Sequence, residues 1–328
     1  MNMLVNTLYL IIGLLLILWG ANALTDGASA IAKKWGVSDL IIGLTVVAFG
    51  TSAPELTISI ISAINGNAGM AIGNVVGSNI FNVLVIVGIT AMFRPIRIEK
   101  SIMTNDIPFV VLSALILLVI GNSPFFDKGS LAEISRTDGI ILLFFFLIFL
   151  RYTFTQVKPA EIQVSTVEVP SGKTENGMKL WKAILWVILG LVCLIFGGDR
   201  FVTGASGIAS GLGVSDAVIG LTIVAAGTSL PELATSVTAA IKGKTGIALG
   251  NVIGSNIYNI FLVLGCSATI TPLPFGDITN IDLMVLAGGC LLFWIFGWII
   301  GNRTITQVEG AILNASYVTY ITFLLLSL

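Results

Sequence analysis

The chain has 328 residues, of which 56% are hydrophobic and only 10% are charged, and its formal net charge is -1. A soluble globular protein has roughly 25% charged residues, so this chain cannot cover its surface with side chains that face water. The composition predicts an integral membrane protein, and no basic cluster supports a nucleic-acid partner. The absence of histidine removes histidine-based triads, zinc motifs and proton relays, so we expect neither an enzyme nor a bound cofactor.

Long apolar runs recur along the chain, each able to cross about 30 Å of hydrocarbon, for which roughly 20 helical residues suffice. The period-two alternation of a transmembrane β-barrel is missing. The sequence therefore predicts an all-α membrane protein with ten transmembrane helices, near residues 4–25, 38–64, 69–93, 102–121, 138–157, 180–201, 214–241, 246–271, 281–300 and 306–327.

The central part of the chain occurs twice. Residues 43–88 recur without a gap at 220–265, always 177 positions further on, and more than half of the aligned residues are identical. The motif GVSD recurs in the same way just before each copy. The similarity also reaches matching glycines in the first and sixth spans, at 13, 20 and 27 and at 190, 197 and 204.

Two repeats of five spans follow from this duplication, residues 1–157 and 180–328, joined by a polar linker at 158–179. Because five is odd, the second repeat must enter the membrane from the opposite side. Transporters built from such inverted-topology repeats bind substrate near the middle of the bilayer, between the repeats and on interrupted helices.

Loop charges predict the orientation. Most of the Lys and Arg residues, including those of the linker, would lie on one side of the membrane, and the other side would receive only Lys128, Arg136 and Arg200. By the positive-inside rule, the linker is cytoplasmic and both termini are extracellular, in the cell membrane.

Each repeat carries an acid within an apolar span, Glu55 in GTSAPE and Glu232 in GTSLPE. An ionised carboxylate at membrane depth costs several kcal/mol or more unless something compensates its charge. Neither segment contains a Lys or Arg, so the simplest partner is a cation that binds and leaves. A single membrane Glu is often structural, but two in matched contexts favour ion transport.

A proline precedes each acid. Pro54 and Pro231 cannot donate the backbone hydrogen bond of a regular helix, and each opens the preceding turn. The carbonyls freed near residues 48–51 and 225–228 would be tolerated only where they line a cavity. They are hard oxygen ligands, suited to Na⁺ or Ca²⁺.

Helical spacing aligns further polar side chains with the acids. All of them offer hard oxygen ligands, which suits Ca²⁺ with its six to eight oxygens and disfavours a soft transition metal. The four stripes are Thr51, Ser52, Glu55 and Ser59; Thr228, Ser229, Glu232 and Ser236; Asn74, Ser78 and Asn82; and Asn251, Ser255 and Asn259.

Several polar residues have structural interpretations beside the functional ones. GNVVGSN and GNVIGSN contain GxxxG, which is typical of close helix packing. Asn74 and Asn251 remain open between bracing helices and touching the ion, whereas Asn79 and Asn256 fit bracing better. Asp26 and Asp199 fit positions at span ends, and Asp39 and Asp216 follow Ser in GVSD, a pattern that marks a helix start.

At these motifs the chain resembles the cation/calcium exchanger superfamily, most closely the sodium/calcium exchangers. GTSxPE together with GNxxGSN, each present twice, is highly specific, and the likeness covers nearly the whole chain outside the linker. The resemblance implies a monomer that exchanges external Na⁺ for Ca²⁺ by alternating access. It also implies that the first and sixth spans are a pair of long tilted helices that slide across the rest.

The resemblance further implies a set of ion ligands. Glu55 and Glu232 would bind the central ion. The other ligands would be the backbone carbonyls of Ala48 and Ala225 and the side chains of Thr51, Ser52, Ser78, Asn82, Thr228, Ser229, Ser255 and Asn259. Potassium-dependent relatives carry Asp where this chain has Asn259, which weakens the expectation of K⁺ co-transport.

Three other functions are open to these residues. Protons could neutralise the two acids, so an H⁺/Ca²⁺ exchanger of the same fold is the nearest alternative. A channel would need a continuous pore, whereas interrupted inverted halves favour an occluded site. A membrane enzyme is the weakest alternative, because the motifs offer no pair of nucleophile and base.

Overall fold

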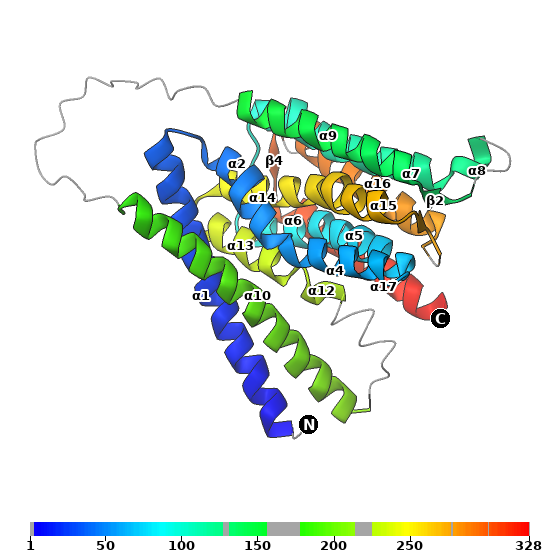
Figure 1. Ribbon diagram of the computed structural model, residues 1–328. Coiled ribbons are helices and arrows are strands. Elements are labelled where there is room, and N and C mark those ends of the chain that lie inside the picture. The colour runs from blue at the N-terminus through cyan, green and yellow to red at the C-terminus, as the bar shows by residue number, and fades with distance from the viewer. Residues whose placement is uncertain are drawn as a thin grey trace, which may run out of the picture.

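The computed structural model (Figure 1) describes residues 3–126, 131–155, 178–213, 225–276, 278–300 and 302–327. Within these residues the chain is mostly helical. In the described ranges, eight helices are long and apolar enough to cross a membrane, or nine when the bent pair Asp39–Thr51 and Ala53–Ile64 counts as one span. The protein is therefore a multi-pass membrane protein. The predicted linker lies outside the described residues except for its last two, and so do residues 214–224 of the predicted seventh span.

The first half supplies the helical elements α1 (Met3–Trp35), α2 (Asp39–Ile42), α3 (Ala48–Thr51), α4 (Ala53–Ile64), α5 (Ala68–Phe81), α6 (Val87–Phe93), α7 (Ile107–Gly121), α8 (Ser123–Phe126) and α9 (Arg136–Thr155). Short π-helical stretches interrupt the spans at η1 (Gly43–Val47), η2 (Asn82–Ile86) and η3 (Ile102–Asp106).

The described part of the second half supplies α10 (Leu180–Gly211), α12 (Ala225–Gly227), α13 (Leu230–Ile241), α14 (Thr245–Ile257), α15 (Gly265–Ile270), α16 (Asn280–Ile295) and α17 (Gln307–Ser327), with π-helices η5 (Tyr258–Leu264) and η6 (Phe296–Ile300). Two pairs of two-residue antiparallel strands complete the fold. β1 (Ile96–Arg97) pairs with β4 (Thr304–Ile305), and β2 (Glu133–Ile134) pairs with β3 (Leu273–Pro274).

The first and sixth spans are longer than predicted. Expected at 4–25 and 180–201, they continue to Trp35 and Gly211, giving helices of 33 and 32 residues. Each stops shortly before a glycine with positive φ, Gly36 at 66° and Gly213 at 86°, a conformation that commonly ends helices. At about 1.5 Å per residue, both helices exceed the roughly 30 Å of a bilayer's hydrocarbon.

These two helices, α1 and α10, pack against each other along their length and diverge from the remaining bundle toward the N-terminal end of α1 (Figure 1). The seven-residue glycine spacing seen in the sequence forms their contact. A Cβ at Gly20 would stand 2.8 Å from the carbonyl oxygen of Gly190, and one at Gly27 would stand 2.7 Å from that of Ala183. Only glycine permits such close backbone approach.

The core is formed by the third and eighth spans. In their most apolar windows, 83% of Ala68–Phe93 and 94% of Thr245–Ile270 is buried, against 22% in α1 and 28% in α10. The halves also exchange packing partners: α9 lies on α15, α17 lies on α6, and both strand pairs join one half to the other. The hydrophobic core consequently contains residues of both halves.

Candidate ion-binding site

In each half a helix is interrupted close to the proline, as the sequence predicts. Asp39–Thr51 and Ala53–Ile64 meet at 45°, with Ser52 at φ -85° and ψ 6° between them. Pro54 then lies in the first turn of α4, where its missing N–H is not needed. In the second half Ser229 has φ -91° and ψ 6°, and Pro231 lies in the first turn of α13. The two breaks therefore occur at matching positions.

Each break also brings an acid into the first turn of the following helix. Glu55 is 0% exposed and Glu232 is 1% exposed. The partial positive charge of a helix N-terminus stabilises a carboxylate in this position, but only in part. Among the described residues, no Lys or Arg forms an ion pair with either acid. Within the described part of the chain, the two buried charges thus have no fixed basic partner.

The two acids lie close enough for their charges to interact. A hydroxyl from the opposite half binds one of them, since Ser52 Oγ donates to Glu232 Oε1 at 3.2 Å. Ser78 Oγ donates to Glu55 Oε1 at 3.5 Å. The chain thus assembles one polar site from residues 23 to 180 positions apart.

Two threonines reinforce the contacts between the halves. The Thr228 side chain hydrogen-bonds to Glu55, and the Thr51 side chain hydrogen-bonds to Glu232. The single hydroxyl proton of Thr51 has a second acceptor in Asn251 Oδ1, which lies 3.0 Å from Thr51 Oγ1. Each acid therefore contacts the helix break of the other half.

Beside the acids or on the helices that pack near them, several buried polar atoms have no hydrogen-bond partner within the described part of the chain. Such an atom costs on the order of 1–3 kcal/mol when it stays unsatisfied. A hard cation that takes six to eight oxygens has the chemistry to satisfy a group of this kind. The oxygens are Glu55 Oε2, Glu232 Oε2, Ser229 Oγ, Ser255 Oγ, Asn82 Oδ1 and Asn259 Oδ1.

Asn82 and Asn259 lie in the π-helices of the core spans. η2, which begins at Asn82, packs against α13, and η5, which contains Asn259, packs against α4. Asn259 Nδ2 donates to Asn79 Oδ1 at 3.0 Å, whereas Asn259 Oδ1 has no partner among the described residues. π-Helical turns occur frequently at functional sites.

Asn74 and Asn251, which the sequence left open, brace the helices that carry the acids. Asn74 Nδ2 donates to the backbone oxygen of Glu55 at 3.2 Å and to Ser59 Oγ at 3.0 Å. Asn251 Nδ2 donates to the backbone oxygen of Glu232 and to Ser236 Oγ at the same two distances. The equal geometry indicates one structural task performed in both halves.

Asn79 braces two helices, as expected, whereas the Asn256 side chain bonds within its own helix. Asn79 Nδ2 donates to the backbone oxygen of Asn256 at 3.1 Å, and Asn256 Nδ2 donates to that of Val252 at 2.7 Å. The Asn79 bond links α5 to α14, whereas the Asn256 bond stays within α14.

One expectation about the backbone needs correction. The Ala48 carbonyl is not freed by the break, because it accepts the Ser52 N–H at 3.0 Å and lies 3.4 Å from Thr51 Oγ1. The proline lies too far along the chain to remove either donor. Ala225, the counterpart of Ala48, is the first described residue after residues 214–224.

Three other acids singled out in the sequence, Asp26, Asp39 and Asp199, lie outside the site. Asp26 pairs with Lys242 at 2.6 Å, and Asp199 pairs with its neighbour Arg200 at 3.6 Å. Asp39 begins α2, with Ser38 accepting the N–H of Ile41 at 3.3 Å, as expected for a helix start. The matching Asp216 lies outside the described residues.

Sequence reasoning did not single out three further buried acids, Asp106, Asp282 and Glu309. Asp106 is 1% exposed, and its carboxylate lies near the side chain of Tyr152 in α9. A partly similar pair exists in the second half, where Tyr320 Oη donates to Asp282 Oδ1 at 2.7 Å. For Asp106 the signal was an Asp inside the predicted span 102–121, which has no counterpart in the duplicated motifs.

Comparison with known proteins identifies the family of this chain. The family model for "Sodium/calcium exchanger protein" matches residues 5–155 and 182–326. The "Putative antiporter CaxA" of Alkalimonas amylolytica is 37% identical over 320 residues, covering 97% of this chain and 98% of the relative. The "Sodium/calcium exchanger MaX1" of Methanosarcina acetivorans is 34% identical over 352 residues, covering 98% of both.

A solved structure has the same fold. The sodium-calcium exchanger NCX_Mj, soaked with 2.5 mM Na⁺ and 0.1 mM Ca²⁺, superposes with a TM-score of 0.80 at 33% identity, covering 97% of each chain. Fold and site thus define a membrane antiporter of cations, a class of transporter rather than of catalytic enzyme. The chain belongs to the sodium/calcium exchanger family.

Proposed function

We propose that this protein exchanges Na⁺ for Ca²⁺ across the cell membrane by alternating access, with the ions bound near the bilayer midplane between Glu55 and Glu232. One observation carries the proposal: two fully buried acids from opposite halves interact with each other and form no ion pair with a Lys or Arg of the described residues. Such a pair is costly inside a membrane unless mobile cations neutralise it.

The proposed ligands extend around the two carboxylates. Hydroxyl and amide oxygens of both halves lie beside them or on the helices that pack against them, and several are buried without a partner. The ligand set comprises Glu55, Glu232, Thr51, Ser52, Ser78, Asn82, Thr228, Ser229, Ser255 and Asn259, with the backbone carbonyls of Ala48 and Ala225 as further candidates.

Coupling follows from charge. Both ions need the same hard oxygens, so Ca²⁺ and Na⁺ exclude each other. The empty site would carry two negative charges and would resist the change of access, whereas a filled site could pass through it. Ca²⁺ would neutralise the pair of carboxylates without excess charge. Exchange, rather than leak, is the expected outcome.

The architecture proposed for this function is ten transmembrane helices in two inverted five-helix repeats, residues 1–157 and 180–328. The linker at 158–179 would be cytoplasmic and both termini extracellular, and the protein would act as a monomer. The matching helix breaks and the reciprocal packing of α9 on α15 and of α17 on α6 support two equivalent halves.

Calcium uptake into reconstituted vesicles tests the proposal. We expect an outward Na⁺ gradient at fixed pH to drive Ca²⁺ uptake. Glu55→Gln or Glu232→Gln should abolish this uptake, because each substitution removes a negative charge that binds the cation. Glu99→Gln, at an exposed position, is the matched control and should keep uptake. Full Na⁺-driven uptake by Glu55→Gln would show that this residue is not a ligand.

H⁺/Ca²⁺ exchange is the second candidate. Buried carboxylates can also take protons, and the relative from Alkalimonas amylolytica is named only as an antiporter, with no ion specified. In the same vesicles, a pH gradient imposed without Na⁺ separates the two functions. Uptake driven by the pH gradient alone would show that H⁺, rather than Na⁺, is exchanged for Ca²⁺.

A further inference from the structure

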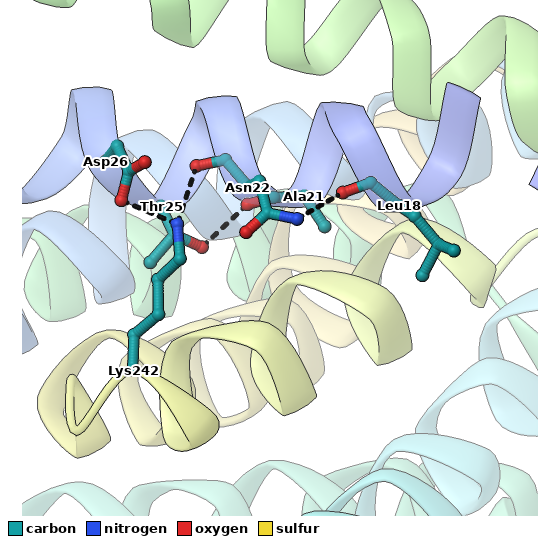
Figure 2. A network of polar contacts seen from close by, with 6 residues as sticks. All are labelled: Leu18, Ala21, Asn22, Thr25, Asp26 and Lys242. Carbon is teal, nitrogen blue, oxygen red and sulfur yellow. Dashed lines mark hydrogen bonds and ion pairs between the residues drawn. The ribbon is translucent and has the colours of Figure 1, made fainter. Parts of the chain in front are cut away.

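An ion pair ties the long helix α1 to the helix that carries Glu232. Lys242 Nζ lies 2.6 Å from Asp26 Oδ1 and 3.3 Å from the backbone oxygen of Asn22 (Figure 2). Lys242 is the C-cap of α13, and Glu232 lies in the first turn of the same helix. A movement of α1 relative to α13 would therefore stretch or break this contact.

The pair is distinctive among the charge contacts nearby. Lys244 lies 3.6 Å from Asp39, and Arg94 donates to the backbone oxygen of Ile241 at 3.2 Å, but both contacts stay within the bundle. Among the ion pairs of the described residues, only Asp26–Lys242 joins the α1–α10 pair to the other helices.

The duplicated sequence shows what the opposite side of the molecule lacks. The offset of 177 residues maps Asp26 onto Thr203 of α10 and Lys242 onto Asn65, just after α4. Neither counterpart carries a charge. An equivalent contact between α10 and α4 could therefore contain no ion pair.

The packing of these helices differs between the two halves, as their charges do. α1 packs along α13, whereas α10 makes no comparably extensive contact with α4 in the described part of the chain. Ile61 of α4 is 53% exposed, while its counterpart Thr238 on α13 is partly buried. Of the two equivalent helix pairs, α1 with α13 and α10 with α4, only the first is packed together in this structure, and it is the pair that contains the ion pair.

We infer that Asp26 and Lys242 form a one-sided latch, which favours the state with α1 closed on α13 over the state with α10 closed on α4. The inference rests on the proposed function, in which two inverted repeats exchange conformations during transport. By the proposed orientation, the closed side is cytoplasmic, so the latch favours the outward-facing state. Asp26 and Lys242 are positioning residues and do not touch the ions.

The latch tunes the balance of states without locking it. The side chains of Lys242 and Asp26 are 29% and 48% exposed, and ion pairs with such exposure contribute little. A shift of about two- to fivefold in the ratio of the two states is the expected size. High salt should reduce the shift, because solvent ions screen exposed charges.

Cysteine labelling measures the ratio. In a chain lacking Cys193, Cys266 and Cys290, Ile61→Cys reports whether α4 is open to the outside. We expect Asp26→Asn and Lys242→Gln each to slow external labelling by a membrane-impermeant maleimide about two- to fivefold. The charge swap Asp26→Lys with Lys242→Asp should restore the rate. Unchanged labelling in both single variants would overturn the latch.

A transplanted latch gives the matched control. Thr203→Asp with Asn65→Lys, placed in the Asp26→Asn background, should slow labelling further, because the ion pair then stabilises the opposite state. The Thr203→Asp change alone should not. A general loss of packing cannot produce this pattern, and equal rates with and without the second pair would contradict the inference.

Transport kinetics provide an independent readout. A ligand's apparent affinity falls as its binding-competent state becomes rarer, so Asp26→Asn should raise the external KM for Ca²⁺ and lower the internal one. Parallel changes on both sides would indicate a structural defect instead. If the unsubstituted protein shows no Na⁺-driven uptake, the proposed function fails. If uptake is normal and neither labelling nor KM responds, only the latch is wrong.

Discussion

At the scale of single residues, Asn74 and Asn251 perform the same task with one difference. Both hold the backbone of the helix turn that carries a buried acid, at equal distances. Asn251 also accepts the hydroxyl of Thr51 from the opposite half. The second amide therefore positions both an acid and a candidate ligand of the other repeat.

This difference predicts unequal effects of one substitution. Asn251→Ala should weaken Ca²⁺ binding more than Asn74→Ala, because it also releases Thr51. Each loses buried hydrogen bonds and should destabilise the fold by about 1–3 kcal/mol. Calorimetric titration with Ca²⁺ and thermal unfolding in detergent would measure both effects. An equal loss of affinity in the two variants would mean that the Thr51 contact has no role in binding.

At the scale of elements, α1 and α10 form one unit through their glycines. The backbones approach so closely that a methyl group at Gly20 would meet both the Gly190 carbonyl and, at 3.1 Å, Cβ of Cys193. Such contacts over the length of both helices indicate a pair that moves together rather than two independent spans.

The same Gly→Ala change should therefore have opposite results at two sites. In an ordinary helix it stabilises by roughly 0.5–1 kcal/mol, and Gly288→Ala in α16 meets nothing within 4 Å. Gly20→Ala should instead destabilise by about 1–3 kcal/mol, as overpacking does, and should slow Ca²⁺ exchange. Thermal unfolding of the two purified variants measures the difference in stability. Equal melting temperatures would contradict a tight contact between α1 and α10.

At the scale of the whole molecule, neither half completes its own core. The last helix of each half packs on a helix of the other half, α9 on α15 and α17 on α6, and glycines lie at both contacts. A Cβ at Gly88 would stand 2.8 Å from the Gly310 carbonyl oxygen, and one at Gly139 would stand 2.9 Å from that of Gly265. The strand pairs add two further links between the halves.

We predict that residues 1–157 and 180–328, expressed separately, do not fold alone but assemble when produced together. Each fragment by itself would expose the core surfaces that the other covers. Co-purification through a tag on one fragment, with protease resistance compared with the intact chain, measures the assembly. A single fragment that is monomeric and protease-resistant would show that the halves are independent domains.

The sequence by itself determined the class of protein, the approximate spans and the two central acids. Span length and hydrophobicity are properties of continuous segments, and the duplication is visible as a constant offset. Glu55 and Glu232 stand out because an acid in an apolar run needs an explanation wherever the chain folds. The family followed from the same motifs and is supported by the comparisons.

The tertiary structure alone decided which polar residues brace and which remain unpaired. Asn74 and Asn82 lie on one stripe of the sequence, yet the first bonds to the helix of Glu55 and the second has no partner among the described residues. The reciprocal packing of the halves, the hydrogen-bonded Ala48 carbonyl and the Asp26–Lys242 pair were also hidden. Each depends on which segments meet in space, and a contact between residues 216 positions apart leaves no mark on either local sequence.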